Sequence, residues 1–333
     1  MPIKPEGLGN DCRHTECDAL AGAPNDNHGR RLVEAALVAE ENVSGIALVT
    51  DSTANLPAEL VEQLSVTVVP VYVRFEDRVY RDGVDMDNAT FYRRLRETGA
   101  MPRTSQPSVG DFLEVYRRLS ANHEDIISIH ISGDLSGTVT AAQLAAEQLQ
   151  QENPDGTRVH VVDSRVTSGA QALLVTAAAR AVAAGKGAVE VVARVKDIIP
   201  RLRIAFMLAT LEYLRRGGRI GAAAALAGTL LQVKPILEIR DGGIHVLEKV
   251  RTASRARRRL YEIIEEWGKG HPVRTAVAHA DAPDDAQEVA EFIRSRLDVR
   301  ELVVVEFSPV VGTHGGPGSL GAVVYADPED AAG

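Results

Sequence analysis

The stretch DIISIHISGDLSGTVTAAQLAAEQLQQENPDGTRVHVVDS, residues 125–164, determines the fold class of this chain. DIISIHI reads as a buried strand, TVTAAQLAAEQLQ has the spacing of a helix, and VHVVDS reads as a second strand. The same alternation occurs upstream, where the apolar run IALVT is followed by the turn and helix-start residues DSTANLP. Strands that alternate with helices indicate a parallel sheet covered on both faces.

The chain has 333 residues, enough for two domains. We expect two α/β domains with mostly parallel sheets, at residues 45–160 and 161–328. Residues 1–44 form an N-terminal extension, and their content of Gly, Pro, Asn and Asp predicts partial disorder. Four local expectations can be checked individually. Residues 66–75 read as a strand interrupted by Pro70, and 101–108 as a loop. Residues 220–233 read as a buried helix, and 235–250 as a hairpin around Asp241-Gly242-Gly243.

Composition excludes some classes of function. The 37 Lys and Arg against 46 Asp and Glu give a net charge of −9, which argues against a general nucleic-acid binder. The cysteines, Cys12 and Cys17, lie near the N-terminus, so no disulfide is expected in the core, as suits a cytoplasmic protein. His14 and His28 complete a weak zinc pattern, and a metal-free tail is the favoured interpretation. No apolar run reaches the length of a membrane span, so we expect transient membrane contact at most.

Four segments follow strands or precede helices, where ligands bind in α/β proteins. They are Asp51–Thr53, Arg103–Ser108, Ser132–Thr138 and the glycine-rich segment VGTHGGPGSLG at 311–321. The hydroxyls of Thr104 and Ser136 can either cap a helix or help to bind an anion. His314 can bond a loop carbonyl, or its flanking glycines can bring it close to a ligand. Together, the hydroxyls and the imidazole suggest a site for one small anionic group.

Seven segments occur in a specific order over about residues 45–326: ALVTDSTANLP, RTSQPSVGDFLEVY, ISIHISGDLSGT, VVDS, LEYLRRGGRIG, KPILEIRDGG and GTHGGPGSLG. This set resembles the DegV family of bacterial fatty-acid-binding proteins, which includes lipid-carrier subunits of the bacterial fatty-acid kinase. The resemblance implies a tunnel between two domains that holds a long-chain fatty acid. It also implies a carrier without turnover of its own and without a cofactor, which presents the acid to a kinase catalytic subunit. An enzyme of phospholipid metabolism then uses the acyl phosphate.

The resemblance assigns roles to particular residues. It places the carboxylate of the fatty acid at Thr104, Ser136 and His314, with secondary contributions from Ser105, Ser132 and Thr138. Gly133 departs from the family pattern, which often has a serine there, and so removes one hydroxyl. Arg219 and Arg251 are candidates for contact with the kinase or the acyl phosphate, because a guanidinium suits a phosphate.

Other interpretations remain open. Ser136, His314 and Asp163 could form the triad of a lipid esterase, although the serine is displaced by one residue from the G-x-S-x-G motif. Asp51 could begin a phosphatase loop, but Thr53 replaces the second aspartate, and a helix-start turn is favoured. The run at 220–233 is either a wall of the lipid pocket or plain core. Arg255, Arg257, Arg258 and Arg259 are better explained as a solvated helix face with acidic partners.

Overall fold

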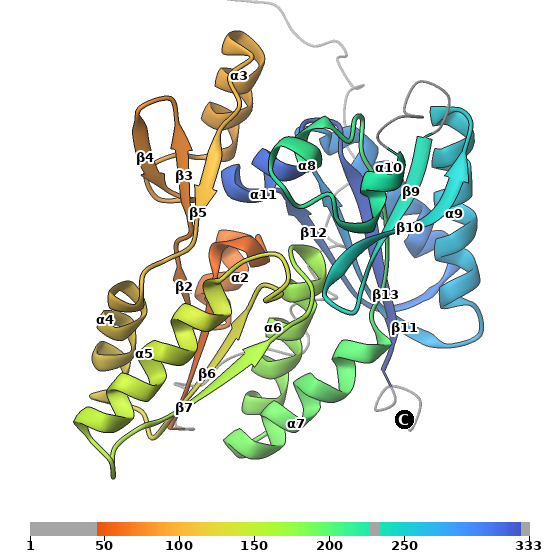
Figure 1. Cartoon of the computed structure of the whole chain (residues 1–333). Coiled ribbons are helices and arrows are strands. Elements are labelled where there is room, and N and C mark those ends of the chain that lie inside the picture. Colours follow the sequence, from red (N-terminus) through yellow and green to blue (C-terminus); the bar gives the residue numbers. More distant parts are fainter. Residues whose placement is uncertain (1–44, 227–233, 328–333) are drawn as a thin grey trace, which may run out of the picture.

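The structure, a computed structural model, describes residues 45–226 and 234–327 and contains two large sheets with helices between and outside them (Figure 1). The first sheet has four parallel strands in the order β2-β1-β6-β7. They are β1 (Ile46–Asp51), β2 (Val66–Val69), β6 (Asp125–His130) and β7 (Arg158–Asp163). β1 and β6 are buried throughout, which explains their apolar sequences. The expected parallel sheet is confirmed here, whereas the predicted extension at 1–44 lies outside the described residues.

Helices cover both faces of this sheet, as Figure 1 shows. Ala47 and Val49 of β1 point toward α4 (Val109–Ser120) and α5 (Thr138–Glu152). The alternate residues Ile46 and Leu48 join the core formed with α6 (Gly169–Ala183) and α7 (Ala188–Ile198). This alternation follows from the twofold side-chain period of a strand.

α6 joins the two halves of the molecule. It contacts β1 and β6 of the first sheet and also β11 and β12 of the second. Of its 15 residues, 13 are buried. Its sequence is rich in alanine, and these small side chains allow both sheets to pack closely against one helix.

The second sheet has six strands in the order β10-β9-β8-β13-β11-β12. They are β8 (Arg203–Met207), β9 (Lys234–Arg240), β10 (Gly243–Val250), β11 (Pro272–His279), β12 (Asp298–Glu306) and β13 (Leu320–Ala326). Among these strands only β11 and β12 pair in parallel, so the expectation of a mostly parallel second sheet is wrong. The reason is that one helix crossover, α10 (Pro283–Arg296), joins β11 to β12, while the predicted hairpin reverses the chain between β9 and β10. Asp241 and Gly242 have φ values of 52° and 84° in that confirmed hairpin, as a type I′ turn requires.

A small third sheet lies beside these two, with the antiparallel order β4-β3-β5. It consists of β3 (Tyr72–Phe75), β4 (Arg78–Arg81) and β5 (Arg103–Ser105), and α3 (Asn88–Thr98) lies between β4 and β5 in the chain. Pro70 ends β2, so residues 66–75 form two strands in different sheets because proline lacks the N–H that a ladder needs. The loop expected at 101–108 is wrong at 103–105, where the strand is stabilised by pairing with β3 rather than by its own sequence pattern.

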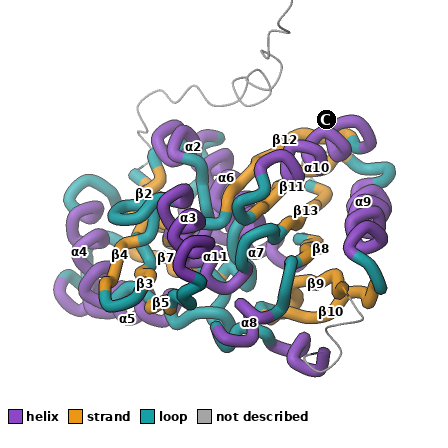
Figure 2. The backbone as a smooth tube through the Cα atoms, turned by 90° about the horizontal axis from the view of Figure 1, so that it is seen from above, coloured by secondary structure: helices purple, strands orange, loops and turns teal. Residues whose placement is uncertain are grey.

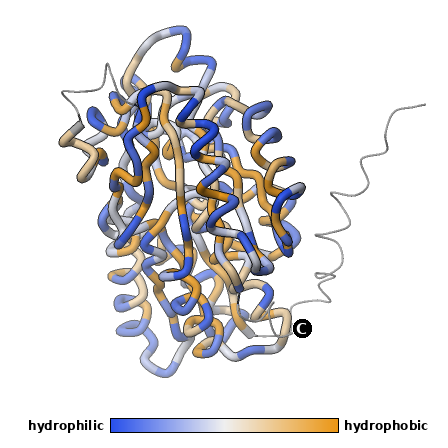
Figure 3. The backbone as a smooth tube through the Cα atoms, turned by 90° about the vertical axis from the view of Figure 1, so that its right-hand side faces the viewer, coloured by the Kyte–Doolittle hydropathy of each residue, from blue (hydrophilic) through white to orange (hydrophobic). Residues whose placement is uncertain are grey.

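The remaining elements are short, apart from the outer helix α9 (Ala253–Gly268). They are α2 (Ala58–Gln63), α8 (Glu212–Arg216), α11 (Pro309–Gly315), and the 3₁₀ helices η1 (Ser52–Ala54), η2 (Ile199–Arg201) and η3 (Gly221–Leu226). The buried helix expected at 220–233 is wrong in its described part, because η3 is a 3₁₀ helix with mostly exposed residues, and 227–233 lie outside the described residues. α9 and α10 show alternating hydrophilic and hydrophobic segments (Figure 3), as expected for helices with one side on a sheet.

Candidate functional site

A cavity of about 420 Å³ lies where the first half of the chain meets the second sheet. Its apolar wall comes mainly from the second half of the chain and includes Ile204, Phe206, Ala278 and Val323 of the second sheet. Its polar wall comes mainly from the first half: Thr53, Thr104, Ser105, Gln106, Ser136, Thr167 and Ser168. His314 and Arg219 also line it. The cavity is therefore apolar on one side and carries hydroxyls and an imidazole on the other.

Thr104 and His314 meet across this cavity although 210 residues separate them. The Oγ1 of Thr104 lies 2.9 Å from Nε2 of His314. β5 positions the threonine through its pairing with β3, where Thr104 lies opposite Val73. The predicted proximity of these two side chains is thus present in the structure, and it depends on a strand that sequence analysis missed.

The glycine-rich segment around His314 is not an open loop. Residues Pro309–Gly315 form α11, and His314 lies in its last turn. α11 lies between the small sheet and α8 (Figure 2). A Cβ at Gly312 would be 2.6 Å from the hydroxyl of Tyr92, so this glycine lets α11 approach α3. Gly316 ends the helix with φ 76°, a conformation that suits glycine.

A buried carboxylate holds the beginning of α11. Ser308 donates a 2.7 Å hydrogen bond to Asp82, and the N–H of Val310 donates one of 3.3 Å to the same carboxylate. Burial raises the pKa of Asp82 to about 6, against the opposing effect of these bonds and of Ser52. Asp82 therefore acts as a long-range cap that ties the helix of His314 to the end of β4.

The surroundings of His314 favour the neutral form of its imidazole. Burial, and to a lesser degree the charge of Arg219, lower the pKa of His314 to about 4. Its Nδ1 is buried and has no hydrogen-bond partner among the described residues. At neutral pH the ring thus has one nitrogen beside Thr104 and another packed against Gly217.

Ser136 lines the same cavity at the start of α5. Its hydroxyl lies 2.9 Å from Oγ1 of Thr138 and accepts a 3.3 Å bond from the N–H of Thr138. Gln106 reaches this point, since a Cβ at Gly137 would be 2.8 Å from its Cδ. Ser136 thus accepts a bond from the first amide of α5, although the N-cap position is Gly137, and it also faces the cavity.

The other predicted residues separate into two groups. Ser105 and Arg219 line the cavity, and Arg219 donates to the carbonyls of Leu135, at 3.0 Å, and Gly217, at 2.8 Å. Within the described ranges, Ser132, Thr138 and Arg251 are not among the lining residues. Ser132 instead donates to the carbonyl of Gly242, at 2.8 Å, and so anchors the hairpin.

The basic stretch after Arg251 behaves as the solvated helix face that we expected. Arg257 pairs with Asp285 and Glu288. Arg258 and Arg259 share Glu262, and Arg259 also pairs with Glu248 and Glu266. Arg251 itself is exposed.

Four polar residues that line the cavity received no individual role from the sequence. They are Thr53 and Gln106, which lie within the candidate segments Asp51–Thr53 and Arg103–Ser108, and Thr167 and Ser168. Thr53 and Gln106 belong to segments that carried the family resemblance, so that signal was available. Thr167 and Ser168 follow VVDS without a recognisable motif. Conversely, residues 220–226 of the apolar run do not line the cavity, which contradicts its proposed role as a wall in the part that the structure describes.

The esterase alternative fails on geometry. Asp163 accepts hydrogen bonds from the N–H groups of Gly133 and Arg165, at 3.2 and 2.9 Å. His314 is bonded to Thr104, and its other nitrogen has no partner among the described residues. The three side chains therefore do not form the hydrogen-bonded chain that a triad requires.

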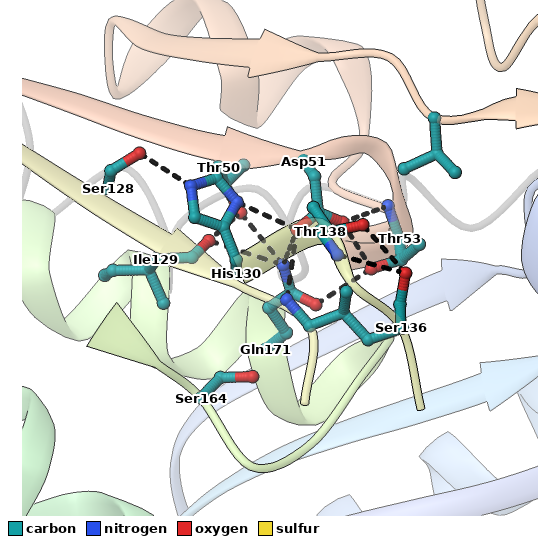
Figure 4. A network of polar contacts seen from close by, with 12 residues as sticks. Thr50, Asp51, Thr53, Ser128, Ile129, His130, Ser136, Thr138, Ser164 and Gln171 are labelled. Atoms are coloured by element: carbon teal, nitrogen blue, oxygen red, sulfur yellow. Dashed lines mark hydrogen bonds and ion pairs between the residues drawn. The ribbon is translucent and has the colours of Figure 1, made fainter. Parts of the chain in front are cut away.

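The phosphatase alternative also fails, because Asp51 is completely buried in a polar network (Figure 4). Although burial is the largest single influence and acts to raise it, the pKa of Asp51 is lowered by bonds from His130, Thr53 and the N–H of Ile131. Gln171 of α6 joins the same network through Asp51 and Thr53. Asp51 therefore connects β1, β6 and α6 and is not accessible as a nucleophile.

The described ranges hold neither a metal-binding cluster nor a membrane-spanning helix. No group of three or more His, Cys, Asp or Glu side chains there is placed to hold a metal ion. No helix in this part of the chain combines the length and the apolar character needed to cross a bilayer.

Comparison with known proteins identifies the family of this chain. A DegV domain-containing protein of Streptomyces coelicolor is 42% identical over 84% of this chain and 98% of its own length. A Thermus thermophilus structure described as fatty acid binding of a DegV family protein matches with a TM-score of 0.79 and 36% identity, over 85% of this chain and 99% of the other. The Bacillus subtilis structure of DegV, described as a fatty acid binding protein, matches with a TM-score of 0.77 and 34% identity over the same shares. The family described as "Uncharacterised protein, DegV family" matches residues 45–327, and the chain belongs to this DegV family.

Proposed function

We propose that this protein binds a long-chain fatty acid, with the carboxylate at Thr104, Ser136 and His314 and the acyl chain along the apolar wall of the cavity. The observation that carries the proposal is one cavity in which a half-buried Thr104–His314 pair faces an apolar sheet surface. Its volume of about 420 Å³ lies within the range of small-molecule sites. The relatives from Thermus thermophilus and Bacillus subtilis, described as fatty acid binding, support the same ligand class.

The head group of the ligand requires hydrogen-bond donors. A carboxylate in an apolar surrounding protonates unless donors stabilise its charge. A neutral His314 can donate from Nε2 to Thr104, which leaves the hydroxyl hydrogen of Thr104 free for the carboxylate. Ser136 offers a second hydroxyl, and the guanidinium of Arg219 adds a positive charge to the same cavity. These groups fix the orientation of the ligand.

The acyl chain supplies most of the affinity. A sixteen-carbon acid has about 14 methylenes, and burial of each contributes ~0.8 kcal/mol, or about 11 kcal/mol before costs. Ordering of the chain and loss of ligand freedom subtract a large part of this amount. The apolar wall therefore determines how tightly the ligand binds, and the polar cluster determines which end faces which way.

The carrier role is the finer part of the proposal. Ser105 and Gln106 line the cavity and are exposed, so the polar end of the cavity reaches the surface. A kinase subunit can approach the carboxylate from that side, with Arg219 and the exposed Arg251 as candidate contacts for the subunit or the acyl phosphate. The protein itself has no turnover in this scheme. It works in the cytoplasm, touches membranes only transiently, and delivers the acyl phosphate to phospholipid metabolism.

The experiment is a titration of delipidated protein with oleate or palmitate, together with mass analysis of lipid extracted from the purified protein. Thr104→Val and Ser136→Ala should each weaken binding about 10- to 100-fold, because each removes a hydrogen bond to a charged group. Thr140→Val, on the exposed side of α5, is the matched control and should leave affinity unchanged. Wild-type protein that neither carries nor takes up fatty acid, or variants with wild-type affinity, would refute the assignment.

A further inference from the structure

Two hydroxyls of the cavity wall have no role in the carboxylate cluster. Oγ1 of Thr167 and Oγ of Ser168 are buried, and neither has a hydrogen-bond partner in the described part of the chain. Ser168 is 4% exposed, and both residues line the cavity. A buried hydroxyl without a hydrogen-bond partner is unfavourable, so native proteins retain one mainly where water or a ligand supplies the missing bond.

These hydroxyls lie at the N-terminal end of α6. Ser168 occupies the N-cap position, yet its side chain makes no capping bond. The first amides of an α-helix have no partner within the helix and mark the positive end of its dipole. The side chain of Gln171, in the first turn of α6, does not cap the helix either, because its amide hydrogen-bonds to Thr53, Thr50 and Asp51. The helix end therefore offers donors toward the cavity in addition to the two hydroxyls.

The surroundings of this helix end are apolar. A Cβ at Gly169 would be 2.9 Å from the Cβ of Ala276 and 3.8 Å from that of Ala278, so the start of α6 packs directly on β11. Ala278 lies opposite Gly321 of β13, and both line the cavity. The two hydroxyls thus adjoin the wall assigned to the acyl chain, where a plain alkyl chain cannot form hydrogen bonds.

The backbone holds Ser168 in place. Its N–H donates a 2.8 Å bond to the carbonyl of Thr53, and its φ of 54° lies in the left-handed region. A glycine would adopt this conformation without strain, so the position tolerates loss of the side chain on backbone grounds. The side chain can therefore be removed without disturbing the conformation.

We propose that Thr167, Ser168 and the first turn of α6 form a second polar subsite, which receives an oxygen substituent on the acyl chain. The ligand class is a long-chain fatty acid with a hydroxyl or oxo group along its chain, and this proposal rests on the fatty-acid site proposed above. Such a group accepts from the hydroxyls and amides, and a hydroxyl can also donate to either side-chain oxygen. No covalent step is involved.

The test compares stearic acid with positional isomers of hydroxystearic acid, by competition against a fluorescent fatty acid. In wild-type protein at least one isomer should bind as tightly as stearic acid or more tightly. Ser168→Gly and Thr167→Val should each weaken that isomer about tenfold and leave stearic acid nearly unchanged, because a hydrogen bond to the substituent is lost. Ser168→Ala removes the same hydroxyl but retains the Cβ. It should change selectivity as Ser168→Gly does, which separates the hydroxyl from the backbone effect.

Three results would overturn the proposal. If every hydroxystearic acid binds more weakly than stearic acid by the same factor in wild type and variants, the hydroxyls bind only water. If the variants weaken stearic acid and its hydroxylated forms equally, the two residues act on the carboxylate instead. If wild type binds none of these acids, the proposed function itself is wrong, and this outcome is distinct from a loss of selectivity alone.

Discussion

Gly217 offers a direct test of how the imidazole of His314 is positioned. A Cβ at residue 217 would overlap Nδ1 of His314, lie 2.8 Å from its Cε1, and lie 3.0 Å from the carbonyl oxygen of Tyr213. Gly217 has φ −74° and ψ −8°, which alanine adopts without strain. Gly217→Ala therefore differs from the wild type mainly in this steric contact with the imidazole.

The magnitude follows from two opposing terms. An extra methyl group in a packed site costs about 1–3 kcal/mol, whereas Gly→Ala at a compatible conformation gains about 0.4–1 kcal/mol. We expect a net destabilisation of about 1–2 kcal/mol in urea unfolding. We also expect about tenfold weaker fatty-acid binding, since the ring must leave Thr104.

The decisive measurement is a double-mutant cycle. In a His314→Ala background the clash with the ring is gone, so Gly217→Ala should be close to neutral and the coupling energy about 1–2 kcal/mol. Gly110→Ala, at an exposed helix position where the new Cβ meets only Ser108 Oγ at 3.5 Å, is the control and should not destabilise. Coupling below about 0.5 kcal/mol, the usual limit of additivity, would show that the ring does not rest on Gly217 and would refute this account.

Two further predictions concern pH and have opposite signs. The pKa of His314 is about 4 in the folded state and near 6.5 when unfolded, so the unfolded chain takes up a proton first as pH falls. Between about pH 7.5 and about pH 5, wild type should therefore lose about 2 kcal/mol of unfolding free energy relative to His314→Asn. Parallel plots of unfolding free energy against pH for the two proteins would contradict this. The pKa of Asp82 is about 6 in the folded state against 3.8 when unfolded, so the folded protein takes up this proton first. Over the same pH interval, the unfolding free energy of wild type in urea should rise by about 1.4 kcal/mol relative to Asp82→Asn. The same pH dependence in both proteins, or a relative loss, would show that the carboxylate is not desolvated.

Much of the fold was predictable because the physical signals were local. β1 and β6 are continuous apolar runs, which fits their complete burial, and α4 and α5 have helical spacing. Ser108 with Asp111 forms the capping box that begins α4. Strand direction in the second sheet is a different matter. Whether β8 or β13 runs parallel or antiparallel to its neighbours depends on which strands meet, and their sequences do not contain that information.

In the candidate site, too, some features could be read from local sequence and others depend on tertiary contacts. The segments that hold Thr104, Ser136 and His314 were recognisable, but their residue types alone allowed capping or carbonyl bonding. β5 was missed because three residues, Arg103–Ser105, have no strand period, and α11 was missed because glycine usually disfavours helices. Both elements exist through tertiary contacts: β5 through pairing with β3, and α11 through Asp82 at its start and the close approach of Gly312 to Tyr92.

These contacts also explain why the polar cluster can be adjusted separately from the two large sheets. Residues 71–106 reach α11 and the segment before it through several long-range bonds. Asp82 accepts from Ser308 and from the N–H of Val310, Thr104 meets His314, and Tyr92 Oη donates to the carbonyl of Phe307 at 2.9 Å. None of these bonds belongs to the ladder of either large sheet. A change that weakens them should therefore separate α11 from the small sheet and abolish the head-group site, while the sheets and their helices remain folded. Local unfolding of this kind lies at the low end of the stability range of a protein, where ligand-binding elements are commonly found. If a fatty acid bridges Thr104 and His314 as proposed, it stabilises this junction more than the sheets, so hydrogen exchange should slow most in α11 and β5 on ligand addition.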